Sequence, residues 1–144
     1  MRFRLIDRVI SFENGDNPRL VTAKAFPHCD EFTLGYPQRP GEVPTCLILE
    51  SLAASGVRLV YACTDGAVVG LLLKVEVAQI LAPLLAGEEL VVETELLGLQ
   101  AEARQGVGVA QTRGRASAGD RLVAEARMVL LCFPKDGFET SLPW

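Results

Sequence analysis

The stretch from Pro44 to Gly56 constrains the fold of this chain more than any other. It reads PTCLILESLAASG, and its apolar residues continue around nearly every side of a helix instead of forming one stripe. A helix that is hydrophobic all round is expected to be buried in a protein core. The rest of the chain should therefore surround a helix that starts at Thr45, a candidate N-cap, and ends at Ala62 or Cys63.

Glu50 is the one acidic residue within this stretch. A carboxylate is seldom fully buried unless something pairs with it or uses it. Burial disfavours the charged form, so the pKa of Glu50 is expected to rise toward neutral pH, as a general acid requires. Two interpretations stay open on the residues alone: a catalytic acid, or a structural ion pair with one of the arginines.

Size and charge limit the possible classes of protein. The chain has 144 residues, enough for one domain with a proper core, and its formal net charge is −4. We expect a single domain over 1–144, with a core at 5–133 and a C-terminal tail at 134–144. The acidic balance and the lack of a basic run argue against a nucleic-acid partner.

The cysteines and the apolar segments bear on metal binding and location. Four scattered cysteines and one histidine have no ligand spacing, so no metal site and no disulfide framework are predicted. The N-terminus has no apolar run long enough for a signal peptide. Charged residues interrupt the apolar zone 57–85, which argues against a membrane span. Reduced thiols in a cytoplasmic protein without a membrane partner are expected.

Runs of β-forming residues alternate with turn-forming residues outside the helix. Strands are expected at 4–12, 20–25, 67–81, 90–97, 107–116 and 122–133. Between them lie a proline-rich structured loop at 26–44, a polar connection at 98–106 and a hairpin turn at 118–120. Alternation at 90–97 puts one set of residues on a buried face: Leu90, Val92, Thr94 and Leu96. The pattern predicts an α+β fold, in which an antiparallel sheet of about five or six strands wraps around one long central helix.

Four strings together resemble one known family. They are LIDRV at 5–9, VPTCLILESL at 43–52, GEELVVETELL at 87–97 and GRASAGDRLVAEA at 114–126. The order of elements and these strings resemble the β-hydroxyacyl-ACP dehydratases of the FabZ/FabA type, which have the hotdog fold. The resemblance spans nearly the whole chain. It implies a hotdog fold, at least a homodimer or a higher oligomer, a site formed between protomers and no cofactor.

The family's active site pairs a histidine, in a Gly-His-Phe-Pro string, with an acidic residue fourteen positions later on the central helix. Glu50 matches that acid, but position 36 is tyrosine, within GYPQRP at 35–40. The only histidine, His28, lies eight residues too early. The resemblance thus assigns Glu50 and Tyr36 as the candidate catalytic pair, with Gly35 and Pro37 beside the substrate.

The exchange of histidine for tyrosine leaves three readings open. Dehydration needs a base for the Cα proton and an acid for the departing hydroxyl, and tyrosine, with a reference pKa of about 10, donates far better than it accepts. In the first reading Glu50 acts as both the base and the acid, while Tyr36 orients the substrate. Alternatively, the protein is a hotdog thioesterase that uses Glu50, or a non-catalytic acyl-binding or partner subunit. Tyr36 is equally well read as a packing aromatic.

The resemblance also assigns the start of the helix. Helix N-termini present unpaired N–H groups and a partial positive charge, and those near Thr45 and Cys46 would polarise the thioester carbonyl. Thr45 stands where the family usually has glycine.

The acyl carrier is left open between acyl carrier protein (ACP) and CoA. The family's basic string near the tunnel mouth is missing at 78–85. Arg39, Arg113 and Arg115 are possible substitutes, although charged residues on strands more often form a solvated face. The first choice is a 3-hydroxyacyl-thioester dehydratase-like lyase of fatty-acid-type metabolism, with altered or lost activity as one possibility.

Overall fold

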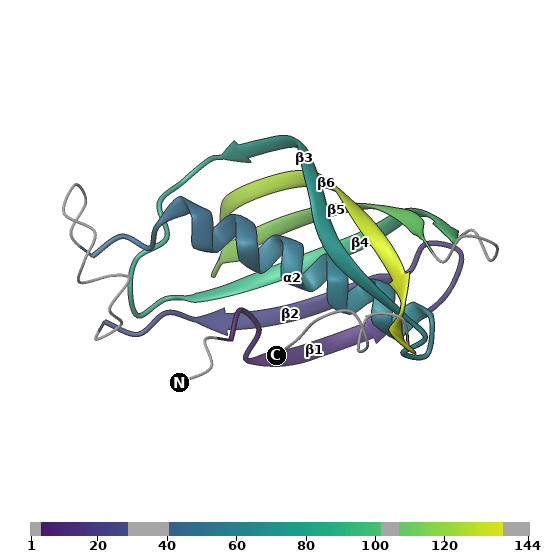
Figure 1. Cartoon of the computed structure of the whole chain (residues 1–144). Helices are drawn as coiled ribbons and strands as arrows, with labels where there is room; N and C mark the ends of the chain where they lie inside the picture. The colour runs from purple at the N-terminus through teal and green to yellow at the C-terminus, as the bar shows by residue number, and fades with distance from the viewer. Residues whose placement is uncertain (1–3, 29–40, 102–106, 137–144) are drawn as a thin grey trace.

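One curved sheet holds one long helix on its inner face (Figure 1). The structure is a computed structural model, and the residues that it describes are 4–28, 41–101 and 107–136. In chain order the elements are β1 (Arg8–Glu13), β2 (Arg19–Ala25), α2 (Thr45–Cys63), β3 (Val68–Ile80), β4 (Glu89–Ala101), β5 (Gly108–Ala118) and β6 (Arg121–Pro134). The α+β hotdog architecture predicted from the sequence is confirmed.

The sheet has the strand order β1-β2-β4-β5-β6-β3, and all of its pairs are antiparallel. The chain leaves α2 and crosses to the far edge of the sheet, where β3 pairs with β6 alone. As a result β1 and β3 are the two edge strands, and the sheet curls so that both flank the helix (Figure 1).

Buried and more exposed residues alternate along the strands, and the buried ones form the core. In β4 the predicted inward set is buried: Leu90, Val92, Thr94 and Leu96. In β5 buried and more exposed residues alternate strictly, and the inward positions are small. Gly114 shows why: a Cβ built on it would lie 2.6 Å from Cδ2 of Leu52 on α2. The small side chains of β5 thus allow the helix to pack close to the sheet.

A cluster of buried hydroxyl groups ties the middle of α2 to two strands. Ser55, on α2, is fully buried, and its Oγ lies 3.2 Å from Oγ1 of Thr22 and 2.9 Å from Oγ1 of Thr94. Thr22 comes from β2 and Thr94 from β4. Since a buried polar group needs a partner, these bonds favour one position of the helix along the sheet.

The helix is buried on one side only, which corrects the expectation that it is buried all round. Its sheet-facing side is buried, including Leu52, Ser55 and Leu59. On the other side Cys46, Glu50 and Arg58 are exposed. The burial expected for Glu50 is therefore wrong for the single chain, because the edge strands of the sheet do not meet over this side.

Two element boundaries also differ from expectation. Thr45 is the first residue of α2, and Pro44 is the N-cap, without a side-chain capping bond. Proline suits this position because its missing N–H would have no acceptor there. The polar connection was predicted to begin at residue 98, and this boundary is wrong. β4 continues to Ala101, past a shift in its pairing register with β5 between Leu96 and Gly98.

In length and hydropathy α2 resembles a membrane span: it has 19 residues, and a window of 18 of them has a mean hydropathy of 1.5. Its packing gives another explanation. The buried side of α2 contributes to both hydrophobic clusters of the core, together with residues of the surrounding strands. These contacts explain its hydropathy by packing against the sheet.

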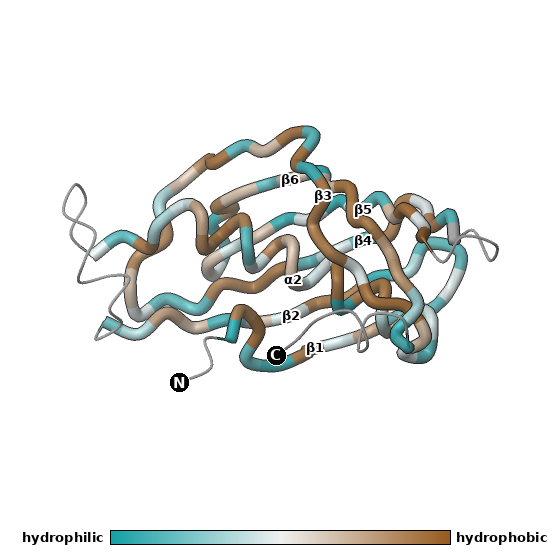
Figure 2. Tube along the Cα trace, in the orientation of Figure 1, coloured by the Kyte–Doolittle hydropathy of each residue, from teal (hydrophilic) through white to brown (hydrophobic). Residues whose placement is uncertain are grey.

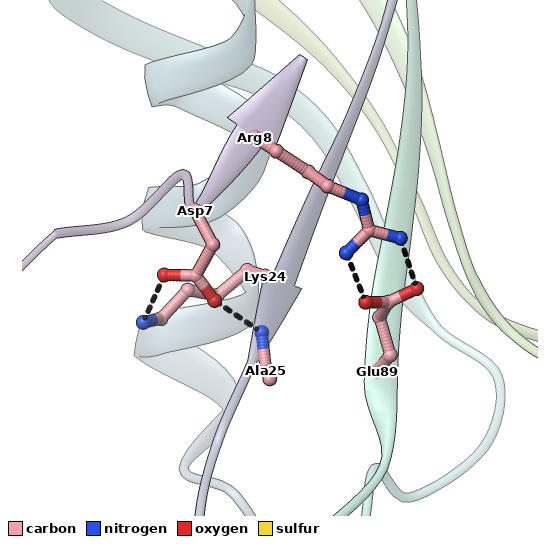
Figure 3. Close-up of polar contacts among 5 residues, drawn as sticks. All are labelled: Asp7, Arg8, Lys24, Ala25 and Glu89. Carbon is pink, nitrogen blue, oxygen red and sulfur yellow. Dashed lines mark hydrogen bonds and ion pairs between the residues drawn. The ribbon is translucent and has the colours of Figure 1, made fainter. Parts of the chain in front are cut away.

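Ion pairs tie the segment before β1 to the neighbouring strands (Figure 3). The Asp7 carboxylate accepts bonds from Nζ of Lys24 at 3.0 Å and from the Ala25 N–H at 2.8 Å. Arg8 donates two bonds to Glu89, at 2.5 and 2.8 Å. Lys24 is an inward-facing, buried residue of β2, so Asp7 compensates a charge that the core would otherwise exclude.

The close contact at Gly114 generates a stability prediction. Replacing Gly114 by Val forces side-chain atoms against Leu52, and we expect the free energy of unfolding to fall by about 1–3 kcal/mol. The matched control is Gly98→Val, because a Cβ at Gly98 meets nothing within 4 Å. Urea denaturation of both variants measures the effect. Equal stability of the two variants would contradict the tight packing of α2 on β5.

The Asp7 contacts generate a prediction about pH. Partial burial acts to raise the pKa of Asp7, but the bonds from Ala25 and Lys24 outweigh it and hold the pKa below its ordinary 3.8. The stabilisation by Asp7 is thus present above pH 3.8 and is lost as the pH falls through the lower pKa of the folded state.

We expect Asp7→Asn to destabilise the protein at neutral pH by about 1 kcal/mol, a small effect because the side chain is partly exposed. The difference from wild type should shrink below pH 4, as measured by urea denaturation over a pH series. A difference that is unchanged at acidic pH would rule out the carboxylate as its cause.

Candidate active site

The start of α2 is held beside the end of β3 by a short backbone pairing. The Val43 N–H donates to the Leu84 carbonyl at 2.8 Å, and the Ala86 N–H donates to the Gly41 carbonyl at 2.8 Å. Between these bonds Glu42 forms an isolated bridge with Leu85. The pairing fixes where the first turn of the helix begins.

A small groove of about 200 Å³ lies at this junction. It is lined by Glu42, Val43, Thr45 and Ile48 on the helix side and by Ile80, Leu81, Ala82, Pro83 and Leu84 on the other. Most of these residues have apolar side chains, but more polar than apolar surface faces the groove.

The first turn of α2 offers N–H groups beside this groove. The first N–H groups of a helix have no acceptor within it, and they carry a partial positive charge. In α2 no acidic side chain lies in the first turn, and no side chain caps it. The N–H groups of Thr45 and Cys46 are thus suited to stabilise a carbonyl oxygen that gains negative charge.

Glu50 lies on the exposed side of α2. It shares that side with Cys46, one turn earlier, whereas Thr45 lines the small groove. From Thr45 to Glu50 the helix rises by about 7 Å. The structure therefore brings a carboxylate and the open first turn to one end of the helix. Gly35, Tyr36 and Pro37 lie outside the described residues, so their place in the site stays a prediction.

His28 lies in the loop after β2, and it is exposed. Its imidazole ring packs against Gly87, at a position that a Cβ on residue 87 would occupy. Gly87 has φ of +90°, and its N–H donates to the Phe26 carbonyl at 2.6 Å. His28 is thus an exposed loop residue whose ring contacts Gly87.

Positive charges near the helix start are paired with carboxylates. Arg8 pairs with Glu89, and Arg121 pairs with Glu88 at 2.6 Å while it also donates to the Pro83 carbonyl. The bonds from Arg121 hold the pKa of Glu88 below its ordinary value. These arginines are thus already compensated, which limits their attraction for an acidic carrier.

Two of the three arginines considered for carrier binding also lie in ion pairs. Arg113 pairs with Glu95 at 2.6 Å, and Arg115 pairs with Glu125 at 2.9 Å. Both pairs lie on the outer face of the sheet. Their arrangement fits the alternative that these arginines belong to a solvated charged face. Arg39 lies outside the described residues.

A larger hollow on this outer face was not predicted from the sequence. It measures about 840 Å³, and residues of all six strands line it, among them Arg19, Glu95 and Arg127. Its charges alternate in sign between neighbouring strands, which the sequence pattern of single strands does not reveal. It lies on the side of the sheet away from α2, so it is separate from Glu50.

Metal binding has no support in the described part of the chain. Within residues 4–28, 41–101 and 107–136 no group of three or more histidine, cysteine, aspartate or glutamate side chains is arranged to hold a metal ion.

Comparison with solved structures shows proteins of the same fold. The fluoroacetyl-CoA-specific thioesterase FlK superposes with a TM-score of 0.63 at 16% identity, over 85% of this chain and 90% of that one. The smu.793 protein of Streptococcus mutans, bound to acetyl CoA, gives 0.61 at 16% identity and covers 94% of both chains. A hot-dog-like protein from Thermanaerovibrio acidaminovorans gives 0.59 at 18% identity, over 90% and 89%.

Comparison by sequence identifies the family. No family model matches the chain. The 3-hydroxyacyl-[acyl-carrier-protein] dehydratase FabZ of Symbiobacterium thermophilum is 35% identical over 128 residues, which cover 88% of this chain and 84% of that protein. With this identity over most of both chains and the hotdog fold in common, the chain belongs to the FabZ-type dehydratase family of hotdog proteins.

Proposed function

We propose that the protein acts as a dehydratase on 3-hydroxyacyl thioesters, with Glu50 as its acid–base residue. The observation that carries the proposal is the position of Glu50, which lies exposed on α2 near the open first turn, in a chain 35% identical to a FabZ dehydratase. A thioester carbonyl bound at the Thr45 and Cys46 N–H groups would place the adjacent Cα of a substrate that extends along the helix near the Glu50 carboxylate.

The reaction balances with one carboxyl group. The Glu50 carboxylate takes the Cα proton, while the thioester oxygen gains negative charge against the helix N–H groups. The electron pair then forms the Cα–Cβ double bond, and the Cβ–O bond breaks. The proton held by Glu50 passes to the departing hydroxyl, which leaves as water and restores the carboxylate. In this scheme Tyr36 donates a hydrogen bond that orients the substrate.

We further propose a homodimer that forms through β3. This edge strand is exposed along most of its length and is mostly hydrophobic (Figure 2). Leu73 and Val77 are each 55% exposed. An exposed, apolar edge strand invites pairing with another chain, and a second copy offers the same edge. Such pairing would also bring the partner's chain close to the open side of α2.

A thioesterase is the second candidate. It is supported by the fold shared with the fluoroacetyl-CoA-specific thioesterase FlK, which superposes with a TM-score of 0.63. An exposed carboxylate near a carbonyl-binding helix start could equally activate a water molecule for attack on the thioester. Acyl groups on CoA are compatible with either reaction, as the acetyl-CoA complex of smu.793 indicates for that protein.

A cytoplasmic location is part of the proposal. It is supported by the cysteines at positions 46, 63 and 132, which are all free thiols. Burial raises the pKa of the Cys63 and Cys132 thiols, so both are held in the unreactive protonated form.

The central prediction concerns hydration of 2-enoyl thioesters, the reverse reaction. We expect Glu50→Gln to lower the rate by about 10²–10⁴-fold because it removes the proton-transfer group. The matched control is Glu93→Gln, since Glu93 is exposed on the outer face of β4 and should leave the rate unchanged. Loss of the enoyl absorbance measures hydration, on both CoA and carrier-protein substrates.

Release of free thiol is measured on the same samples. Thiol release that depends on Glu50, without hydration, would replace the dehydratase by the thioesterase. A folded wild-type protein that does neither, yet retains an acyl thioester, would leave an acyl-binding role.

The proposed dimer gives a separate prediction. Replacing Leu73 by Lys places a charge in the apolar edge, and we expect the dimer dissociation constant to rise at least about tenfold, or roughly 1.4 kcal/mol. The control is Ile10→Lys, because Ile10 is similarly exposed, at 49%, on the opposite edge strand β1. Light scattering over a dilution series checks both. Weakening by the β1 variant alone would place the interface on the other edge.

A further inference from the structure

One wall of the small groove belongs to the segment between β3 and β4. We call residues 81–88 the joining segment. Pro83 and Leu84 of this segment line the groove opposite the start of α2. Leu84 is fully buried and Pro83 is exposed, so the segment has one side toward the core and one toward solvent. The contacts that hold the joining segment therefore determine the shape of the groove.

On its buried side the joining segment is bonded to the residues just before α2. The Leu84 carbonyl accepts the Val43 N–H at 2.8 Å. Pro44, the N-cap of α2, has no N–H of its own. No main-chain donor therefore lies between this bond and the N–H groups of Thr45 and Cys46. The bond at Leu84 thus fixes the direction in which the chain enters the first turn of the helix.

On its exposed side the joining segment is held by one nitrogen atom. Nη2 of Arg121, the first residue of β6, lies 3.2 Å from the Pro83 carbonyl oxygen and 2.9 and 2.6 Å from the carboxylate oxygens of Glu88. The Leu85 N–H donates to the same carboxylate at 2.8 Å. Hydrogen bonds between charged groups are among the stronger polar contacts in proteins. We call this set of contacts the Arg121–Glu88 clamp.

We propose that the Arg121–Glu88 clamp positions the N–H groups of Thr45 and Cys46 for the thioester carbonyl. The inference rests on the proposed function. Neither Arg121 nor Glu88 lines the groove, so both are positioning residues and act through the joining segment.

The clamp acts through a short path of bonded groups. It holds the residue before Leu84 by the Pro83 carbonyl and the residue after it by the Leu85 N–H. The Leu84 carbonyl lies between these two contacts, and it accepts the Val43 N–H. Because peptide groups are planar, a carbonyl that is fixed on both sides has little freedom to turn. The acceptor for Val43 thus keeps its direction while the clamp is closed.

A nearby ion pair shows what distinguishes the clamp from an ordinary surface contact. Arg8 donates two bonds to Glu89, which follows Glu88 directly in the chain. Exposed ion pairs of this kind typically contribute little to stability. Arg121 differs from Arg8 because it also bonds to a main-chain carbonyl of the groove wall. A bond to the main chain is what a positioning role requires.

Amide hydrogen exchange tests whether the clamp holds the helix start. Arg121→Met removes the charged group and keeps an unbranched side chain. We expect the Val43 and Ala86 N–H groups, which pair the joining segment with the chain before α2, to exchange about tenfold faster. Amides in the middle of β5 should keep their rates. Arg8→Met is the matched control, and it should leave the exchange of Val43 and Ala86 unchanged.

The infrared frequency of a bound carbonyl tests the consequence for the site. The probe is butyryl-pantetheine labelled at its carbonyl carbon, because pantetheine is common to CoA and carrier protein and a saturated chain cannot be hydrated. N–H groups that polarise a carbonyl lower its stretching frequency. We expect wild type and Arg8→Met to lower the frequency equally, and Arg121→Met to lower it less. The frequency is a property of each bound ligand, so a loss of folded protein does not change it.

Hydration kinetics provide the third measurement. The carbonyl gains negative charge only in the transition state, so we expect Arg121→Met to lower kcat and kcat/KM together by about tenfold, with little change in KM. The expected loss is smaller than the 10²–10³-fold loss of about one deleted donor, because the N–H groups are displaced and not removed. Glu88→Ala should have the same effect. The double variant should lose little more, since both changes open the same clamp.

Failure of the clamp and failure of the proposed function give different results. Unchanged exchange of Val43 and Ala86 in Arg121→Met, or faster exchange with an unchanged carbonyl frequency, overturns the clamp and leaves the proposed function intact. A wild-type protein that does not lower the carbonyl frequency overturns both. Absence of hydration overturns the dehydratase alone, because the exchange and infrared measurements need no reaction.

Discussion

The sheet covers α2 on one side only, and the rest of the structure depends on that arrangement. Gly114 and its small neighbours on β5 let the helix pack closely, and the bonds from Thr22 and Thr94 to Ser55 favour one position along the sheet. Because the edge strands do not meet over the helix, its other side remains open. That side holds Glu50, and it adjoins the apolar edge β3. Burial of one side thus creates both a stable core and a surface on which chemistry or assembly can take place.

Much of the fold was predictable from the pattern of apolar and polar residues along the chain. Alternation in β4 identified its buried face, and the apolar run identified α2, whose end was predicted at Ala62 or Cys63 and lies at Cys63. The exposure of Glu50 was not predictable. A helix that is hydrophobic all round can be buried in the core of one chain or against a second chain, and the sequence does not distinguish the two cases. The extent of β4 was underestimated because its last residues include Gly98 and Ala101, which are poor strand formers. Pairing with β5 keeps these residues in the strand.

The candidate site was predictable in part. Family strings led to Glu50, and the start of α2 at Thr45 confirms that the Thr45 and Cys46 N–H groups lie in the first turn. The sequence could not predict that Arg113 and Arg115 are compensated by Glu95 and Glu125, since those pairs join different strands of the folded sheet. Tyr36, which the family resemblance places at the position of the histidine, stays a prediction, and the proposed proton transfer by one carboxylate rests on it.

Incorporation of solvent deuterium at Cα tests the central claim most directly. Hydration of a 2-enoyl thioester in D₂O by the wild-type protein should give a 3-hydroxyacyl product with one deuterium at Cα, delivered through the Glu50 carboxyl group. Mass spectrometry of the product reads this out. The account predicts incorporation at the rate of hydration and its loss in Glu50→Gln. Unchanged incorporation in that variant would show that another group transfers the proton, and it would contradict the assignment of Glu50.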